Sequence, residues 1–244
     1  MASVERIHAI RASAPGLTQP ARFDRVARIY RLMEYLTFGP MLEHCRFHHL
    51  PALQNSCRSL VLGDGDGRFL AQLLATNPTL QADAVDASPA MLALLRQRIA
   101  HLKALERITT TQADARTFSP PSRNYDLVAT HFFLDCLTEP EVDHLITRIR
   151  PHLVDGAQWL VSEFQIPETG CLQKWFARTI ICVLYAAFRL LTGLTVTQIP
   201  PWPEVLTRHG FQRKATRTWL GGLLISELWD FHEATGTSAP PSQP

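Results

Sequence analysis

From Ser59 onward, the chain alternates short apolar runs with longer stretches in which apolar residues recur every three or four positions. This alternation is typical of β-strands joined by crossover helices, and it limits the fold to an open sheet whose strands run mostly parallel. The last two apolar runs, 211–219 and 223–229, flank a short turn containing Gly221 and Gly222, which predicts an antiparallel hairpin at the edge. We therefore expect an α/β fold of about seven strands, mostly parallel with an antiparallel edge strand, and helices on both faces of the sheet.

Local signals place the individual elements within this sheet. Ser88 precedes Pro89 and a helix-periodic stretch, so it predicts the start of a helix, and Thr138 predicts the start of the next one. The segment 202–208 is also expected to be helical, with Gly210 as its stop. Five apolar runs predict the parallel strands: residues 59–63, 82–87, 108–114, 125–133 and 157–164.

The size and composition favour one domain that acts on a small molecule. A chain of 244 residues with 46% apolar residues can bury one substantial core. Its 24 basic and 22 acidic residues give a net charge of +2, which provides no broad basic surface for nucleic acid. Five cysteines without a CxxC pair favour a reducing cytoplasm. We expect one domain over 21–234, with flexible segments at 1–20 and 235–244.

The turn after the first expected strand has the sequence GDGDG, residues 63–67. In open α/β sheets a ligand binds beyond the carboxyl ends of the strands, and the three glycines let the backbone approach it closely. The dinucleotide fingerprint G-x-G-x-x-G fails because its third glycine would fall at Arg68 or Leu70. Two aspartates in the turn would also repel a pyrophosphate, so a cationic ligand fits better.

This pattern resembles the class I S-adenosylmethionine (SAM)-dependent methyltransferases, whose cofactor carries a sulfonium and an ammonium but no phosphate. Their G-x-G-x-G turn matches 63–67, and Asp86 ends the second strand where the family places the carboxylate that accepts both ribose hydroxyls. Asp114 ends the third strand where the family has an acid facing the adenine amino group. The resemblance covers roughly 22–230 and implies a Rossmann-like fold with SAM as the cofactor. The cofactor-binding residues that it implies are Tyr30, Gly63, Asp64, Gly65, Asp86, Ala87, Met91, Asp114, Ala115 and His131.

The N-terminal stretch 23–39 resembles the opening of the ubiquinone/menaquinone-biosynthesis-type methyltransferases. In that group a helix folds over the cofactor, and its tyrosine, here Tyr30, contacts the methionine end. Residues 21–58 are accordingly expected to form an N-terminal helical cap. The same spacing also fits a helix that only packs against the domain through its apolar face, and the sequence leaves both interpretations open.

One residue departs from the family pattern. The family usually has an acid two residues before the first glycine, where it holds the methionine ammonium, and this chain has Val61. Asp64 or His131 could take over this role, or the affinity for SAM could be lower. Asp66 either serves the ligand or complements the dipole at the start of the following helix.

Methyl transfer requires alignment and exclusion of water, because the sulfonium already activates the methyl group. A general base is needed only when the acceptor must lose a proton. The end of the fourth expected strand offers His131 and Asp135 as catalytic candidates. The alternatives are that His131 contacts the methionine part of SAM and that Asp135 caps the helix near Thr138.

A metal site is not expected. His44, Cys45, His48 and His49 lie close together in the sequence, but Arg46 interrupts them and no third ligand group with zinc spacing follows. An interaction surface or the edge of a pocket is the favoured interpretation of this group.

The apolar segment 171–194 follows the fifth expected strand, where members of the family insert elements that cover the substrate. Its longest uncharged run is too short to span a bilayer. We expect a helical insertion at 168–200 on the substrate side, with three interpretations open: a buried helix, an apolar lid, or contact of 174–193 with a membrane surface. The lid interpretation favours a lipophilic or aromatic acceptor.

These observations favour a SAM-dependent methyltransferase that acts on a small lipophilic or aromatic acceptor in the cytoplasm, in solution or at a membrane surface. One alternative is a non-catalytic protein of the same fold that regulates or binds a partner, which Val61 would fit. A nucleotide-dependent oxidoreductase is disfavoured by Arg68 and by the acidic turn. The acceptor atom, the general base and the oligomeric state are left open.

Overall fold

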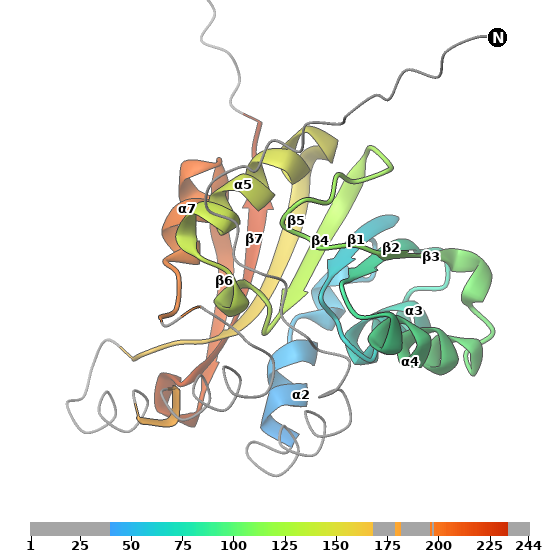
Figure 1. The fold of residues 1–244 in the computed structure, drawn as a ribbon, viewed down its shortest axis with the longest axis horizontal. Coiled ribbons are helices and arrows are strands. Elements are labelled where there is room, and N and C mark those ends of the chain that lie inside the picture. Colours follow the sequence, from blue (N-terminus) through green and yellow to red (C-terminus); the bar gives the residue numbers. More distant parts are fainter. Residues whose placement is uncertain (1–39, 168–178, 182–195, 197, 234–244) are drawn as a thin grey trace, which may run out of the picture.

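The computed structural model in Figure 1 describes residues 40–167, 179–181, 196 and 198–233. Tyr30, with the rest of the first 39 residues, lies outside the described residues, as do most of the expected insertion and the tail. Among the described residues, no helix combines the length and the hydropathy that crossing a bilayer requires.

The described part of the chain contains one seven-stranded sheet with the order β3-β2-β1-β4-β5-β7-β6. The first five strands run parallel, as predicted, and β7 runs antiparallel to both of its neighbours, so that β6 forms the edge. The expected hairpin is therefore confirmed, with its second strand inserted between β5 and the edge strand. The strands are β1 (Arg58–Leu62), β2 (Gln81–Asp86), β3 (Ile108–Gln112), β4 (Tyr125–His131), β5 (Leu153–Phe164), β6 (Phe211–Trp219) and β7 (Leu224–Phe231).

The helices begin where the cap residues predict. Ser88 accepts a hydrogen bond from the Met91 amide at 3.2 Å, and Thr138 forms a reciprocal capping box with Glu141. The α-helices are α2 (Pro40–Phe47), α3 (Arg68–Thr76), α4 (Pro89–Ala100), α5 (Glu139–Ile149) and α7 (Trp202–Arg208). Short 3-10 turns lie at Leu50–Leu53, Leu105–Arg107, Leu134–Cys136, Arg150–His152 and Leu220–Gly222.

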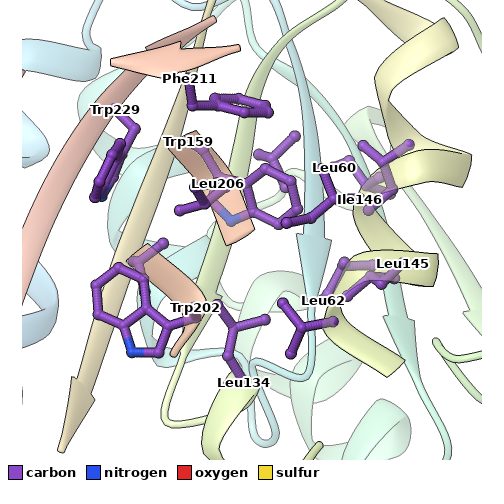
Figure 2. Close-up of a cluster of buried hydrophobic side chains, with 14 of the residues drawn as sticks. Leu60, Leu62, Leu134, Leu145, Ile146, Trp159, Trp202, Leu206, Phe211 and Trp229 are labelled. Carbon is purple, nitrogen blue, oxygen red and sulfur yellow. The ribbon is translucent and has the colours of Figure 1, made fainter. Parts of the chain in front are cut away.

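Two hydrophobic clusters cover the two faces of the sheet, which confirms that helices lie on both sides. On one face, α5 and α7 bury side chains such as Leu145, Ile146 and Leu206 against the strands (Figure 2). There the indole of Trp159 packs edge-on against Phe211 with ring centroids 5.5 Å apart. On the other face, α3 and α4 pack against the strands, and Figure 1 shows these two helices beside β1–β3.

The glycine turn is packed tightly at two of its three glycines. Gly67 has a φ of 77°, and a Cβ placed on it would lie 2.6 Å from Leu95 Cγ and 3.0 Å from Leu95 Cα in α4. Gly63 has a φ of 67°, and a Cβ there would collide with the ring of Phe133. These two glycines therefore permit both the left-handed backbone and the close approach of neighbouring elements.

We expect Gly67→Ala to lower the free energy of unfolding more than Gly156→Ala does. Both positions have positive φ, but a Cβ at Gly156 meets no atom within 4 Å, whereas one at Gly67 meets α4. Overpacking adds about 1–3 kcal/mol to the backbone strain that both variants share. Urea unfolding of both variants measures this difference, and equal losses would contradict the packing role of Gly67.

Candidate functional site

The polar residues of the expected site gather at one edge of the sheet, where strand order reverses between β1 and β4. Leu62 pairs with Val85 of β2 on one side and with Thr130 of β4 on the other, so the glycine turn lies between the ends of both strands. The Gly63 amide donates to the Val85 carbonyl at 2.9 Å, which continues this pairing into the turn. In parallel sheets this switch point is the usual place for a ligand.

Gly65 is the glycine of the turn with the fewest close neighbours among the described residues. A Cβ there would meet only the thioether of Met91, at 3.8 Å, whereas Gly63 and Gly67 are occupied by packing against Phe133 and Leu95. The turn backbone at Gly65 and the buried Met91 at the start of α4 therefore border the position that a ligand could approach.

The carboxylate of Asp64 accepts hydrogen bonds from the backbone that follows the glycine turn. Its Oδ2 accepts from the Leu70 amide at 2.9 Å and its Oδ1 from the Phe69 amide at 3.3 Å, at the start of α3. Burial raises the pKa of Asp64 to about 7, although these amides and the charge of Arg46 oppose the rise. Asp64 is therefore poised to exchange its proton near neutral pH.

Asp66 forms ion pairs and does not lie in the first turn of α3, which contains no acidic residue. Its carboxylate is 2.7 Å from Arg98 Nη2 of α4 and 3.3 Å from Arg68 Nε. The helix-dipole interpretation of Asp66 is therefore wrong, because α3 begins only at Arg68 and the carboxylate is turned toward the two arginines. Asp66 ties the glycine turn to α4.

Asp86 ends β2 beside the glycine turn. Its Oδ1 accepts from the Ser88 amide at 2.8 Å, and its carbonyl accepts from the Ala113 amide at 3.1 Å. Ala87 follows it and is exposed. The side chain of Asp86 is thus oriented by the start of α4.

Asp114 follows β3 at the same edge and is held by Arg116. Its Oδ2 lies 2.6 Å from Arg116 Nη2, and both carboxylate oxygens also accept from Arg116 Nε. Burial would raise the pKa of Asp114, but the hydrogen bonds and charge of Arg116 outweigh it, and the pKa is lowered. Asp114 is therefore a charged, fixed acceptor, and Ala115 beside it is buried.

His131 ends β4 next to the glycine turn and is almost fully buried. Its ring lies against Phe69 with centroids 4.2 Å apart, and neither ring nitrogen has a hydrogen-bond partner among the described residues. Burial, followed by the positive charge of Arg46, lowers the pKa of His131 well below its usual value. The imidazole is therefore neutral at physiological pH and a weak proton acceptor.

The sequence did not point to Arg46 as a site residue, yet its charge acts on the buried His131. It is 6% exposed, and its guanidinium carbon is 5.3 Å from the centre of the Phe132 ring. Its helical spacing from apolar residues could have indicated that Arg46 is buried, because Leu42, Cys45 and Arg46 form the buried face of α2. An arginine on an apolar helix face indicates a buried charge, which is stable only with compensating interactions.

Glu163, the penultimate residue of β5, is a second residue that sequence reasoning missed. It is fully buried, and its Oε1 accepts from the amides of Phe133 at 2.9 Å and Leu134 at 2.7 Å. Burial, and then the neighbouring Asp135, raise the pKa of Glu163 well above its usual value. Glu163 thereby holds the turn after β4, whose Phe133 ring rests on Gly63.

Asp135 lies in the short 3-10 turn after β4, and Thr138 caps the following helix. The capping interpretation of Asp135 is therefore wrong, because Thr138 and Glu141 fill the positions where a cap must lie. Burial raises the pKa of Asp135 to about 6, and its Oδ1 accepts from the Cys136 thiol at 3.4 Å.

Apolar side chains gather at the carboxyl ends of β4 and β5. The rings of Phe132 and Phe164 lie 5.1 Å apart, and Ile180 and Ile181, from the described part of the expected insertion, pack in a cluster with Phe164 and Leu223. The members of the adjoining cluster are Leu42, Cys45, Phe132, Phe164, Trp219 and Leu224.

The histidines near α2 make other contacts. The His48 ring lies 5.3 Å from Trp219, and His49 forms a hydrogen bond with the Ser226 carbonyl. Within the described ranges, no three potential metal ligands come together.

Together, the fold and the site define a Rossmann-like α/β protein with a glycine turn and acidic residues at the switch point of its sheet. Residues 60–156 match the family model described as a methyltransferase domain. This match runs from within β1 to the start of β5 and includes the glycine turn, Asp86 and Asp114. The chain is therefore similar to the class I SAM-dependent methyltransferases, in agreement with the resemblance that the sequence carries.

One curated relative is the malonyl-[acyl-carrier protein] O-methyltransferase of Paenibacillus sp. (strain JDR-2), 28% identical over 158 residues. The match covers 62% of this chain and 54% of the relative, so the chain spans about half the length of that protein.

Solved structures share the fold at low sequence identity. An O-methyltransferase family protein from Burkholderia thailandensis superposes with a TM-score of 0.64 at 18% identity, covering 86% of this chain and 60% of that one. The N-methyltransferase NodS from Bradyrhizobium japonicum WM9, solved in complex with S-adenosyl-L-homocysteine (SAH), superposes with a TM-score of 0.55 at 15% identity. The superposition covers 81% of this chain and 89% of NodS.

We expect Glu163→Leu to destabilise the protein by about 2–4 kcal/mol, because two buried amides lose their acceptor. Glu163→Gln keeps an Oε1 acceptor and the side-chain shape, and we expect it to cost less than about 1 kcal/mol. Denaturant unfolding at neutral pH compares the two variants. Equal stability of the leucine and glutamine variants would show that these hydrogen bonds do not hold the turn.

A pH dependence follows from Asp64. Its pKa of about 7 exceeds the reference value of 3.8, so the folded protein retains a proton that the unfolded chain releases between these values. The contribution of Asp64 to the free energy of unfolding should therefore fall as pH rises through this window. Asp64→Asn removes that contribution. The free energy of unfolding of this variant, measured from pH 4 to 8, should therefore decline less steeply than that of the wild type. Identical slopes of the free energy of unfolding against pH in both proteins would contradict the raised pKa of Asp64.

Proposed function

We propose that this protein is a SAM-dependent methyltransferase that transfers a methyl group to a small lipophilic or aromatic acceptor. The observation that carries this proposal is the sparsely packed backbone at Gly65 beside the β1–β4 switch point, with Asp86 and Asp114 at the carboxyl ends of the neighbouring strands β2 and β3. SAM, when bound, supplies a methyl group that its sulfonium already activates.

The described residues fit the parts of this cofactor. Asp86, oriented by the Ser88 amide, would accept from the ribose hydroxyls, with Ala87 beside it. Asp114, fixed and charged by Arg116, would accept from the adenine amino group, beside Ala115. The nitrogens of His131, which have no hydrogen-bond partner in the described part of the chain, suit the polar methionine end. Gly63 and Asp64 shape the turn itself.

The acceptor would lie beyond β4 and β5. Phe132, Phe164 and the isoleucines at positions 180 and 181 supply apolar surface there, which excludes water and favours a lipophilic or aromatic molecule. If the acceptor must lose a proton, Asp135 suits the role better than His131, because the pKa of Asp135 is raised to about 6 while that of His131 is lowered. A small-molecule acceptor, a cytoplasmic location and membrane contact through 174–193 are parts of this proposal.

A non-catalytic, partner-binding protein of the same fold is the second candidate. The observation that favours it is Val61, which is fully buried in the apolar cluster under α3 and provides no carboxylate for the methionine ammonium.

Isothermal titration with SAH tests the cofactor site. We expect micromolar binding to the wild type and a loss of about tenfold or more in Asp86→Ala, because a hydrogen-bonding carboxylate for the ribose is removed. The control is Asp143→Ala, which removes a half-exposed acid of α5 outside the site and should bind SAH like the wild type. Wild-type protein that does not bind SAH would overturn the proposed function.

The acceptor class is tested by SAH release from SAM. We expect turnover with lipophilic phenols or quinols and little with their charged, water-soluble analogues. SAH binding without turnover on any acceptor would support the non-catalytic candidate, and a preference for charged acceptors would contradict the apolar acceptor site.

A further inference from the structure

Glu163 lies at the edge of the sheet where methyl transfer would take place. His131, the last residue of β4, pairs with Ser162 of β5, so Glu163 lies one residue beyond the end of β4. Its side chain is fully buried. Glutamate is almost never fully buried unless it has compensating partners, so the partners of this carboxyl group indicate its role.

The two oxygens of the Glu163 carboxyl group differ in their surroundings. Oε1 accepts hydrogen bonds from the amides of Phe133 at 2.9 Å and Leu134 at 2.7 Å, which occupy both of its lone pairs. Oε2 is buried as well, but it has no hydrogen-bond partner among residues 40–167, 179–181, 196 and 198–233. The turn after β4 therefore fixes one oxygen and leaves the other for a further partner.

The unpartnered oxygen of Glu163 is a hydrogen-bond donor. Burial raises the pKa of Glu163 well above its usual value, and the nearby Asp135 adds to the rise, so the carboxyl group favours its protonated form. Because the two amides occupy Oε1, the proton belongs on Oε2. A buried hydroxyl group without a partner is costly, and an oxygen atom of a ligand would remove this cost.

Apolar side chains surround this donor. Burial is the main cause of the raised pKa values of Cys45 in α2 and Cys136 after β4, and Glu163 contributes to both, so its carboxyl group lies near both thiols. Cys45 packs in one apolar cluster with Phe132 and Phe164, the rings that we assign to the acceptor side. Glu163 is therefore a polar group beside an apolar surface, where an uncharged ligand oxygen is favoured over an ionic one.

We propose that Glu163 binds the acceptor by donating a hydrogen bond from Oε2 to an uncharged carbonyl oxygen of that molecule. This inference rests on the proposed function and narrows its acceptor class to lipophilic or aromatic molecules that carry a carbonyl group. An apolar surface alone does not fix the orientation of a ligand, whereas one directional hydrogen bond does. Glu163 would thus align the acceptor atom with the methyl group.

The test compares pairs of ligands that differ only at the carbonyl group. The probes are the ortho, meta and para isomers of hydroxyacetophenone and the ethylphenols of matching position, in which a methylene group replaces the carbonyl. Isothermal titration into protein saturated with SAH measures their affinities. The wild type should bind at least one hydroxyacetophenone about tenfold or more tightly than its ethylphenol, as expected for a hydrogen bond in a buried site.

Two substitutions of Glu163 separate ligand binding from stability. Glu163→Leu removes the donor and should abolish the preference for the carbonyl. Glu163→Gln keeps an oxygen for the two amides and supplies an NH₂ donor in place of the Oε2 hydroxyl, so it should retain most of the preference. A role of Glu163 in folding alone would weaken the binding of both members of a pair equally and leave their ratio unchanged.

Asp83→Leu is the matched control. Asp83 is also a buried acid, and it accepts a hydrogen bond from the Tyr125 hydroxyl at 2.6 Å. It lies on β2, which β1 and β4 separate from β5. The variant therefore loses a buried hydrogen bond far from Glu163, and it should keep the preference of the wild type for the carbonyl.

The outcomes distinguish this inference from the proposed function. Equal wild-type affinities within every pair would overturn the inference without any variant, even if Glu163→Leu failed to fold. A preference that survives in Glu163→Leu, or that is lost in Glu163→Gln, would also overturn it. Wild-type protein that binds SAH but none of the probes would overturn the inference and leave the proposed cofactor site intact, whereas protein that does not bind SAH would overturn both.

Discussion

The parallel pairing of β1 with β4 is the contact on which the rest of the site depends. Leu62 lies opposite Thr130, so the glycine turn begins at Gly63 next to His131, the last residue of β4. Because β2 pairs with the other side of β1, Asp86 lies at the same edge. Residues far apart in the sequence therefore reach one position through backbone hydrogen bonds alone, and the turn between them needs glycine because neighbouring side chains fill the space above it.

Burial controls the chemistry of the groups brought together at this edge. It raises the pKa values of Asp64, Asp135 and Glu163 and lowers that of His131, so each group favours its neutral form more than it would in water. Asp114 is the exception, because the hydrogen bonds and charge of Arg116 lower its pKa, keep it ionised and fix its position. Fixed dipoles and few free charges suit a reaction whose methyl group is already activated and which needs mainly alignment.

The sequence predicted the strands, the helix starts and the acids of the switch point, because each leaves a local signal. Ser88 and Thr138 cap helices through residues three positions away, and the strands follow from their apolar periods. The roles of Arg46 and Glu163 could not be predicted, since their partners lie on other elements and only the folded sheet brings them together. For the same reason the sequence left Asp66 between a ligand role and a helix-dipole role, although its partner Arg98 lies 32 residues away. Tyr30 stays a prediction, because it lies outside the described residues.

A crystal structure of the full chain with SAH tests the central claim most directly, namely that the switch point holds the cofactor. We expect the ribose hydroxyls at Asp86, the adenine near Asp114, and the adenosyl group passing over Gly65. SAH bound elsewhere on the protein, or a turn that stays free at saturating SAH, would contradict it.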